Sequence, residues 1–327
     1  MIIGHGPLAF TITATILLAT TKFPNNKILY LATTAGIAAI IPDIDMLLPF
    51  ASIFTVNTLS ITAITNQFWT VSGERHRLAT HSLIILTITT LIAFTIQKIS
   101  TTTAFKPELQ HTKQKIATTI ITITILFTPL SIPLKLLTTT TLITAYFLTT
   151  HKPTNTTTTQ LTLAFLIGTT THPFGDMFTG TPPTFLYPYT NILELTRWTI
   201  PNPTIQLTLL FTLEIGTLIT TILLLEKLTT TNHLTYDKIK PQPKHLLFGL
   251  TNATLITIIA HYYTIPLAPT VDTATKFVLT LVTLTTIINT KTIYKQQYTK
   301  YITDTSWTLL TAILTFTIYY TTTQLLF

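Results

Sequence analysis

Imidazole and carboxylate side chains collect at the ends of apolar segments of this sequence, where they could bind a metal ion together. The seven candidate ligands are His5, Asp43, Asp45, His76, His81, His172 and Asp176. His172 and Asp176 are four residues apart, so on a helix they share one face and can bind one ion. Asp43 and Asp45 flank Ile44 in an extended or turning segment, where both can point inward.

The remaining histidine pair needs a different local structure. His76 and His81 are five residues apart, too far around a helix for one face, so we expect a loop-to-helix junction to bring both inward. The chain has no cysteine, which excludes thiolate sites. Imidazoles with carboxylates suit a divalent transition metal, with zinc as the first expectation and manganese or iron as alternatives. Because one catalytic zinc takes three or four ligands, either two ions bind or some of these residues act in other ways.

Further polar residues beside the candidate ligands could take part in catalysis. Arg77 could bind a phosphate or stabilise an oxyanion, and its alternative is a role as a charged anchor. Glu74, or an aspartate that is not a ligand such as Asp45, could act as general acid or base. Thr80 and Ser82 either cap the following helix or hydrogen-bond to a ligand from behind.

Simpler explanations compete for several of these residues. Asp43 and Asp45 could cap a helix end. Five histidines without an acidic motif nearby are expected to be structural: His111, His151, His233, His245 and His261. Glu214 falls inside an apolar segment, where an acid is a functional candidate, although a protonated Glu bonded to nearby threonines explains it equally.

The composition of the chain predicts the kind of scaffold that must position these residues. Only 9% of the 327 residues are charged, against about 25% in an ordinary soluble domain, so we expect an integral membrane protein. Threonine accounts for 81 residues. Its hydroxyl can bond to a carbonyl three or four residues earlier, which allows a threonine-rich apolar helix to lie in lipid. The net charge of +8 comes from dispersed residues, and no nucleic-acid partner is expected.

Apolar segments divide the chain into an all-α, multi-pass bundle of about ten transmembrane or re-entrant helices. The segments are 7–21, 27–41, 80–97, 116–150, 160–171, 204–225, 246–264, 276–289 and 307–326. Segment 116–150 contains Pro129 and Pro133 and is too long for one span, so we expect a tight hairpin that either crosses the membrane twice or is re-entrant.

Lysine and arginine residues predict the orientation of this bundle. With alternating crossings, 14 of the 19 basic residues fall on one side, which we expect to be cytoplasmic, and the candidate ligands fall on the other. The site would then lie on the extracytoplasmic face of the cell (inner) membrane. A composition change at Pro201-Asn202-Pro203 predicts a catalytic domain over 1–200 and a C-terminal membrane extension of about four helices over 201–327.

Taken together, these motifs resemble the YdjM-like family of membrane-bound, predicted metal-dependent hydrolases, over about residues 1–190. The matching pieces are His5, Pro42-Asp43-Ile44-Asp45, His76-Arg77-x-x-Thr80-His81-Ser82, His172-x-x-x-Asp176-x-x-Thr179 and Pro188. The chain departs from the family pattern at Met46, Leu78 and Pro182, where a His, a Gly and a Gly are usual. The order of His and Asp residues is also distantly similar to zinc-dependent phospholipase C.

The residues and the resemblance together predict a membrane-embedded hydrolase that activates water with one or two metal ions. A phosphoester in a lipid or lipid-linked substrate is the expected target, because the site would face headgroups and Arg77 could bind phosphate. Two rivals remain: a membrane transporter for a metal or small ligand, and a membrane scaffold stapled by a metal. A transporter would place its polar groups near the bilayer midplane, and a staple would have a closed ligand shell.

Overall fold

The computed structural model describes most of the chain up to residue 230 and single residues beyond it. The described residues are 4–57, 61–75, 79–102, 107–153, 155–176, 184–188 and 203–230, with residues 247, 307 and 310. Every regular element among them is helical, which confirms the all-α expectation. The expected segments 276–289 and, apart from those single residues, 246–264 and 307–326 lie outside the described residues.

Two compact units divide the chain. The first contains residues 1–30, 178–180 and 200–327, and the second contains residues 31–177 and 181–199. In the first unit α1 (His5–Thr20) packs against α9 (Pro203–Thr230), where the hydroxyls of Thr11 and Thr221 lie 3.0 Å apart. The boundary expected near residue 200 stays a prediction of domain organisation.

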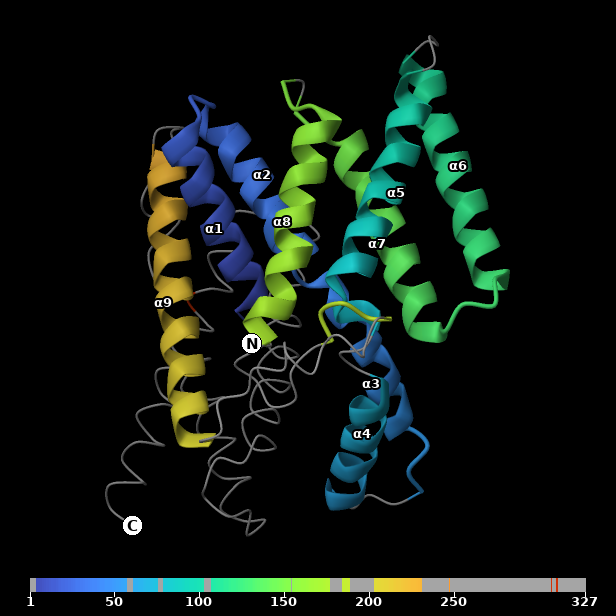
Figure 1. Cartoon of the computed structure of the whole chain (residues 1–327). Coiled ribbons are helices and arrows are strands. Elements are labelled where there is room, and N and C mark those ends of the chain that lie inside the picture. Colours follow the sequence, from blue (N-terminus) through green and yellow to red (C-terminus); the bar gives the residue numbers. More distant parts are fainter. Residues whose placement is uncertain are drawn as a thin grey trace. The chain divides into compact units, whose positions relative to one another are not determined.

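The second unit holds most of the described helices. After α2 (Asn25–Ala38), whose first residues belong to the first unit, come the 3-10 helix η1 (Ile41–Met46), α3 (Leu47–Ile53) and α4 (Ile61–Arg75). They are followed by the 3-10 helix η2 (Ala79–His81), α5 (Leu83–Thr102), α6 (Pro107–Phe127), α7 (Ile132–Thr150) and α8 (Thr158–Asp176). Figure 1 shows α5 to α8 running alternately up and down.

Threonine hydroxyls bond within these helices, as the sequence predicts. Thr89, Thr149 and Thr169 each donate to the carbonyl four residues earlier, at 2.8 to 3.1 Å. Each bond satisfies the hydroxyl without a partner from another helix. A helix rich in threonine can therefore present an apolar surface to its surroundings.

The proline-interrupted segment 116–150 is a hairpin of two antiparallel helices. Pro129 lies in the turn between α6 and α7, and Pro133 occupies the first turn of α7, where a missing N–H costs nothing. The ammonium of Lys135 donates to the carbonyl of Leu126 at 2.8 Å, so that α7 caps the end of α6. The expected hairpin is confirmed, and after it α8 ends at the same end of the unit at which α5 begins. Whether the hairpin crosses twice or is re-entrant stays a prediction.

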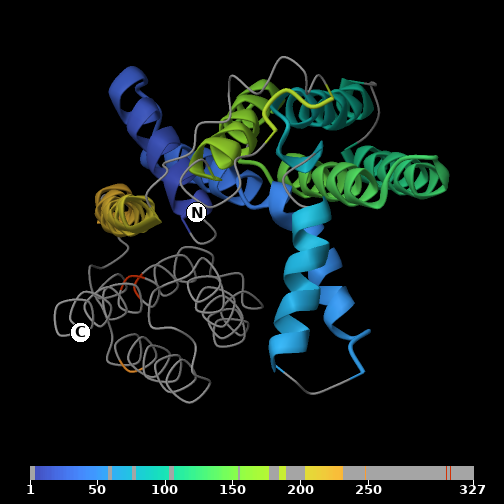
Figure 2. The same ribbon diagram turned by 60° about the horizontal axis from the view of Figure 1, so that its bottom comes forward.

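Helices α3 and α4 were not expected from the sequence. They pack side by side and extend away from the other helices of the second unit (Figures 1 and 2). Neither forms a long apolar run by itself, so the apolar pattern of the sequence does not predict them. Phe50 and Phe68 join the two helices edge to face, with 5.4 Å between ring centroids.

Small and aromatic side chains hold α8 in place within the second unit. A Cβ at Gly168 would collide with the backbone of Ala35 and lie 2.8 Å from the Cβ of Ala38, so only glycine allows α8 to approach α2 this closely. On another face of α8, Phe165 packs edge to face on Phe94 of α5 at 5.2 Å. These contacts fix the height and rotation of α8 relative to α2 and α5.

Three described segments are long and apolar enough to cross a membrane. They are Asn25–Ile53, Leu83–Ser100 and Ile132–Thr150. On α5, Ile88, Leu91 and Ile92 each expose about half of their surface, as lipid-facing side chains do. The helical membrane class is thereby supported, while the total of about ten helices stays a prediction.

Candidate metal centre

Four of the predicted ligands meet at one end of the second unit. The chain reaches this end at the C-terminus of α2, where η1 follows, at η2 before α5, and at the last turn of α8 (Figure 1). Asp43 comes from η1, His81 from η2, and His172 and Asp176 from α8. Their ligand atoms all lie within 4.8 Å of one another, and we call these four residues the His/Asp cluster.

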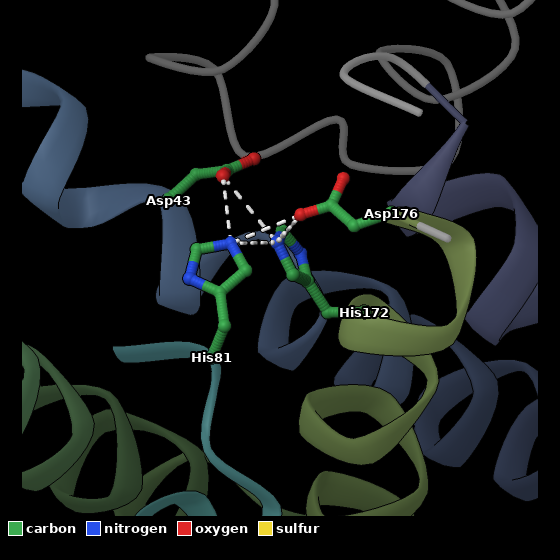
Figure 3. A group of neighbouring side chains, drawn as sticks. All are labelled: Asp43, His81, His172 and Asp176. Carbon is green, nitrogen blue, oxygen red and sulfur yellow. Dashed lines mark hydrogen bonds and ion pairs between the residues drawn. The ribbon is translucent and has the colours of Figure 1, made fainter. Parts of the chain in front are cut away.

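Figure 3 shows that the four side chains of the cluster point toward a common centre. The Nε2 atoms of His81 and His172 are 2.9 Å apart. Oδ2 of Asp176 lies 3.1 Å from Nε2 of His81 and 3.5 Å from Nε2 of His172. Oδ1 of Asp43 lies 3.3 Å from Nε2 of His172 and 3.6 Å from Nε2 of His81.

The far nitrogen of His172 fixes the orientation of its ring. Nδ1 lies 2.6 Å from the carbonyl oxygen of Ala39, which can only accept a hydrogen bond. Nδ1 must therefore carry a proton, so that Nε2 turns its lone pair toward the cluster whenever the ring is neutral. Ala39 follows directly after α2, so a backbone carbonyl at a helix end supplies this contact.

A side-chain contact serves the same purpose for His81. The hydroxyl of Thr80 donates to Oδ2 of Asp45 at 2.5 Å and lies 3.0 Å from Nδ1 of His81. Since the hydroxyl has one proton, which goes to Asp45, Nδ1 of His81 is the donor to the Thr80 oxygen. Nε2 of the neutral His81 ring then also presents a lone pair to the cluster.

Burial and charge act in opposite directions on His81. Burial lowers the pKa of His81, but the hydrogen bonds with Asp176 and then Asp43 raise it by more, so the net pKa lies above its ordinary value. A proton on the ring would place positive charge beside these carboxylates. A divalent cation would supply the same charge in its place.

The cluster passes a geometric test for a bound metal. Four donors about 2.1 Å from a tetrahedral ion are about 3.4 Å apart. The five separations between cluster atoms given above lie between 2.9 and 3.6 Å. Two imidazole nitrogens and two carboxylate oxygens are also a donor set that suits zinc, manganese or iron. The cluster can therefore hold a metal ion with little rearrangement.

Access to the cluster is uneven. His81, His172 and Asp176 expose at most 2% of their side chains, whereas Asp43 exposes 19%. The approach to the cluster is therefore on the side of Asp43.

A short segment, residues 184–188, covers the start of α5. The N–H of Leu83 donates to the carbonyl of Phe185, and the Ser82 hydroxyl donates to the carbonyl of Tyr187, both at 2.8 Å.

Ser82 has the cap role that was one of its two expected roles, since its oxygen also accepts from the N–H of Ile85 at 3.4 Å at the start of α5. Sequence reasoning missed the backbone of Phe185 and Tyr187 as partners. Only Pro188, named for the family pattern, pointed to this part of the chain.

The other predicted site residues are placed as follows. Asp45 is buried and lies behind His81, outside the four-residue cluster. His5 is buried at the start of α1, in the first unit. Glu74 belongs to α4, but its side chain, like the whole of His76 and Arg77, lies outside the described residues. The roles assigned to these residues stay predictions.

Two residues with simpler explanations can also be located. His151 is exposed at the end of α7 and contacts the carbonyl of Phe147 at 3.0 Å, as expected for a structural histidine. Glu214 is 3% exposed in α9, and the hydroxyl of Thr217 donates to its backbone carbonyl at 3.0 Å. Neither residue belongs to the His/Asp cluster.

Comparison with known proteins gives one match. The model of a protein family described as "YdjM inner membrane protein" matches residues 2–263. The match therefore extends beyond residue 190, where the sequence resemblance was expected to end, and includes α9. Neither the curated proteins nor the solved structures contain a significant match.

Proposed function

The chain belongs to the YdjM inner membrane protein family, and from this premise and the buried His/Asp cluster we propose that it is a membrane-embedded, metal-dependent hydrolase. The cluster is the observation that supports the proposal most strongly. Two imidazoles whose Nε2 atoms converge beside two carboxylates form a site that a cation would stabilise. A divalent metal bound there would lower the pKa of a water molecule, so that hydroxide forms near neutral pH.

The protein's own residues would orient this chemistry. His81 and His172 are held from behind, which keeps their Nε2 atoms directed at the ion. Asp176 is almost fully buried, while the partial exposure of Asp43 provides the side from which a substrate approaches. We assign proton transfer to Glu74 and phosphate binding to Arg77, because both lie close to His81 in the sequence.

We further propose that the substrate is a phosphoester in a lipid or lipid-linked molecule. The cluster lies at the end of helices that are long and apolar enough to cross a membrane, where a headgroup would be at the same depth. The distribution of lysine and arginine supports a bundle of about ten spans, with the site on the extracytoplasmic side of the membrane.

The test begins with metal content. The protein purified in detergent should contain a stoichiometric transition metal, and the double variant His81→Ala plus Asp176→Ala should lose it. His151→Ala is the matched control, because His151 is exposed and lies outside the cluster. An activity screen on phospholipids and water-soluble phosphodiesters then tests the reaction: hydrolysis should require the metal and disappear in the double variant.

A second candidate function is metal transport, and one observation favours it. The candidate span Asn25–Ile53 is interrupted by η1, which carries Asp43, and broken helices at ion sites are typical of transporters. Uptake of zinc or manganese into proteoliposomes that depends on Asp43, without any hydrolysis, would favour this function. Metal that stabilises the fold but is neither transported nor catalytically active would favour a scaffold.

A further inference from the structure

Asp43 and Asp45 lie two residues apart, but the fold gives their side chains different surroundings. Both belong to η1, a 3-10 helix with about 120° of rotation per residue, so side chains at these positions point in different directions. Asp43 reaches the cluster, with Oδ1 3.3 Å from Nε2 of His172. Asp45 is 1% exposed and its Oδ2 accepts from the hydroxyl of Thr80.

Thr80 links Asp45 to a ligand. It is fully buried, its proton goes to Asp45, and its oxygen receives the Nδ1 proton of His81. The result is a chain of hydrogen bonds from the Asp45 carboxylate through Thr80 to the ring of His81. Without the Thr80 hydroxyl, Nδ1 of His81 would lose this acceptor, and the tautomer with the proton on Nε2 would become available.

We infer that Asp45 and Thr80 are a positioning pair for His81, and that Asp45 is not itself a metal ligand. The pair sets the tautomer and the ring orientation of His81 so that Nε2 is available to a metal, as hydrogen-bonded groups behind metal ligands generally do. This inference deepens the proposed function and rests on it for the identity of the cluster as a metal site. The chain of hydrogen bonds itself consists of contacts between protein groups and needs no metal.

The same contacts argue against a simple packing role for Thr80. A packing role needs only volume, which valine would supply equally well. The hydroxyl here makes two directed contacts inside a fully buried site, and valine would leave both Asp45 and His81 without that partner. Thr80→Val therefore removes the link with almost no change of shape, and Thr80→Ser keeps the hydroxyl while removing a methyl group.

The first experiment measures zinc affinity by competition with a chelator, in purified full-length protein. We expect Thr80→Val to weaken zinc binding by about 10- to 100-fold and Thr80→Ser to bind within a few-fold of the wild type. X-ray absorption of the zinc-loaded protein should show the same number of nitrogen and oxygen ligands in Asp45→Asn as in the wild type, and a lost oxygen ligand in Asp43→Asn. Wild-type affinity in Thr80→Val, or a lost ligand in Asp45→Asn, would overturn the inference.

A second experiment needs no metal and separates this inference from the proposed function. Nitrogen-15 spectra of the histidine rings, recorded in ion-free protein at a pH where His81 is neutral, should show the proton of His81 on Nδ1. In Thr80→Val that preference should weaken, and Thr80→Ser should restore it. If the wild type binds no metal but shows this tautomer shift, the hydrolase proposal fails and the positioning pair stands. An unchanged tautomer in correctly folded Thr80→Val and Asp45→Asn refutes the pair.

Discussion

His81 and His172 are held from behind by two unlike oxygens. A backbone carbonyl, that of Ala39, orients His172, whereas the Thr80 hydroxyl orients His81. The two rings should therefore respond differently to mutagenesis. Side-chain substitution can release the ring of His81 without touching any ligand, while the contact that holds His172 is built into the end of α2.

Acidity should weaken metal binding at this site. The pKa of His81 is raised in the ion-free protein, chiefly because its bonds with Asp176 and Asp43 outweigh the lowering by burial. A proton and a metal therefore compete for Nε2: as pH falls, the protonated fraction grows and metal affinity drops. Calorimetry in buffers of different ionisation enthalpy should show proton release on zinc binding near neutral pH. A zinc affinity that stays the same from about pH 6 to about pH 8 would contradict this competition between proton and metal.

The spacing of the site residues predicted part of the cluster. His172 and Asp176 are four apart on a helix, and that geometry could be derived from the sequence. Which of Asp43 and Asp45 faces the cluster could not. An extended segment directs residues i and i+2 to the same side, whereas the 3-10 helix that forms here separates them. The link through Thr80 depends on tertiary packing of η1 against η2, which no local pattern encodes.

At the scale of the elements, α8 must lie close to α2 for its two ligands to reach Asp43. Gly168→Ala should disturb this approach, because a Cβ there collides with the backbone of Ala35 and the backbone cannot move aside cheaply. We expect a loss of about 1–3 kcal/mol in unfolding free energy, together with weaker metal binding.

Gly216→Ala is the matched control for this change. It is also a helical glycine, in α9, but a Cβ there meets nothing within 4 Å. Alanine should be neutral or stabilising by about 0.5–1 kcal/mol at that position. Unfolding by a denaturing detergent measures both variants. Equal stabilities of the two variants would show that the α2–α8 contact does not constrain the fold.

Helices α5 and α6 are joined by a buried polar contact. Gln97 is fully buried, and its amide donates to the Thr118 hydroxyl at 3.0 Å. Such bonds between membrane helices average about 0.6 kcal/mol. Gln97→Leu should therefore change stability by no more than about 1 kcal/mol, and the change should largely vanish in a Thr118→Val background. A double-mutant cycle in micelles measures this coupling, and full additivity of the two changes would refute the contact.

The elements themselves were only partly predictable. The lengths of the apolar runs and the positions of the prolines were sufficient to predict α5, α7 and the α6–α7 hairpin. A span needs a long apolar run, and a turn needs residues that interrupt the helix. The α3–α4 pair was missed for the same reason, since neither helix has such a run. Those two helices are stabilised by packing on each other, as Phe50 on Phe68 illustrates.

At the scale of the whole molecule, the direction of the bundle decides which compartment the cluster faces. Ser131 lies in the α6–α7 turn, at the end of the second unit that holds the cluster, and Asn155 lies between α7 and α8 at the other end. The chain has no cysteine, so single cysteines report accessibility without background.

For an extracytoplasmic cluster, a membrane-impermeant maleimide should label Ser131→Cys in intact cells. Asn155→Cys should react only after the membrane is opened. The opposite pattern would place the cluster on the cytoplasmic side, and labelling of both in intact cells would show that α7 does not cross.

The most direct test of the central claim is the metal content of the purified wild-type protein, measured by mass spectrometry beside the His81→Ala plus Asp176→Ala variant and the His151→Ala control. We expect a stoichiometric transition metal in the wild type and the control, and its loss in the double variant. A wild-type protein without metal, even after incubation with zinc, manganese or iron, or a double variant that keeps its metal, would contradict the assignment of the His/Asp cluster as a metal centre.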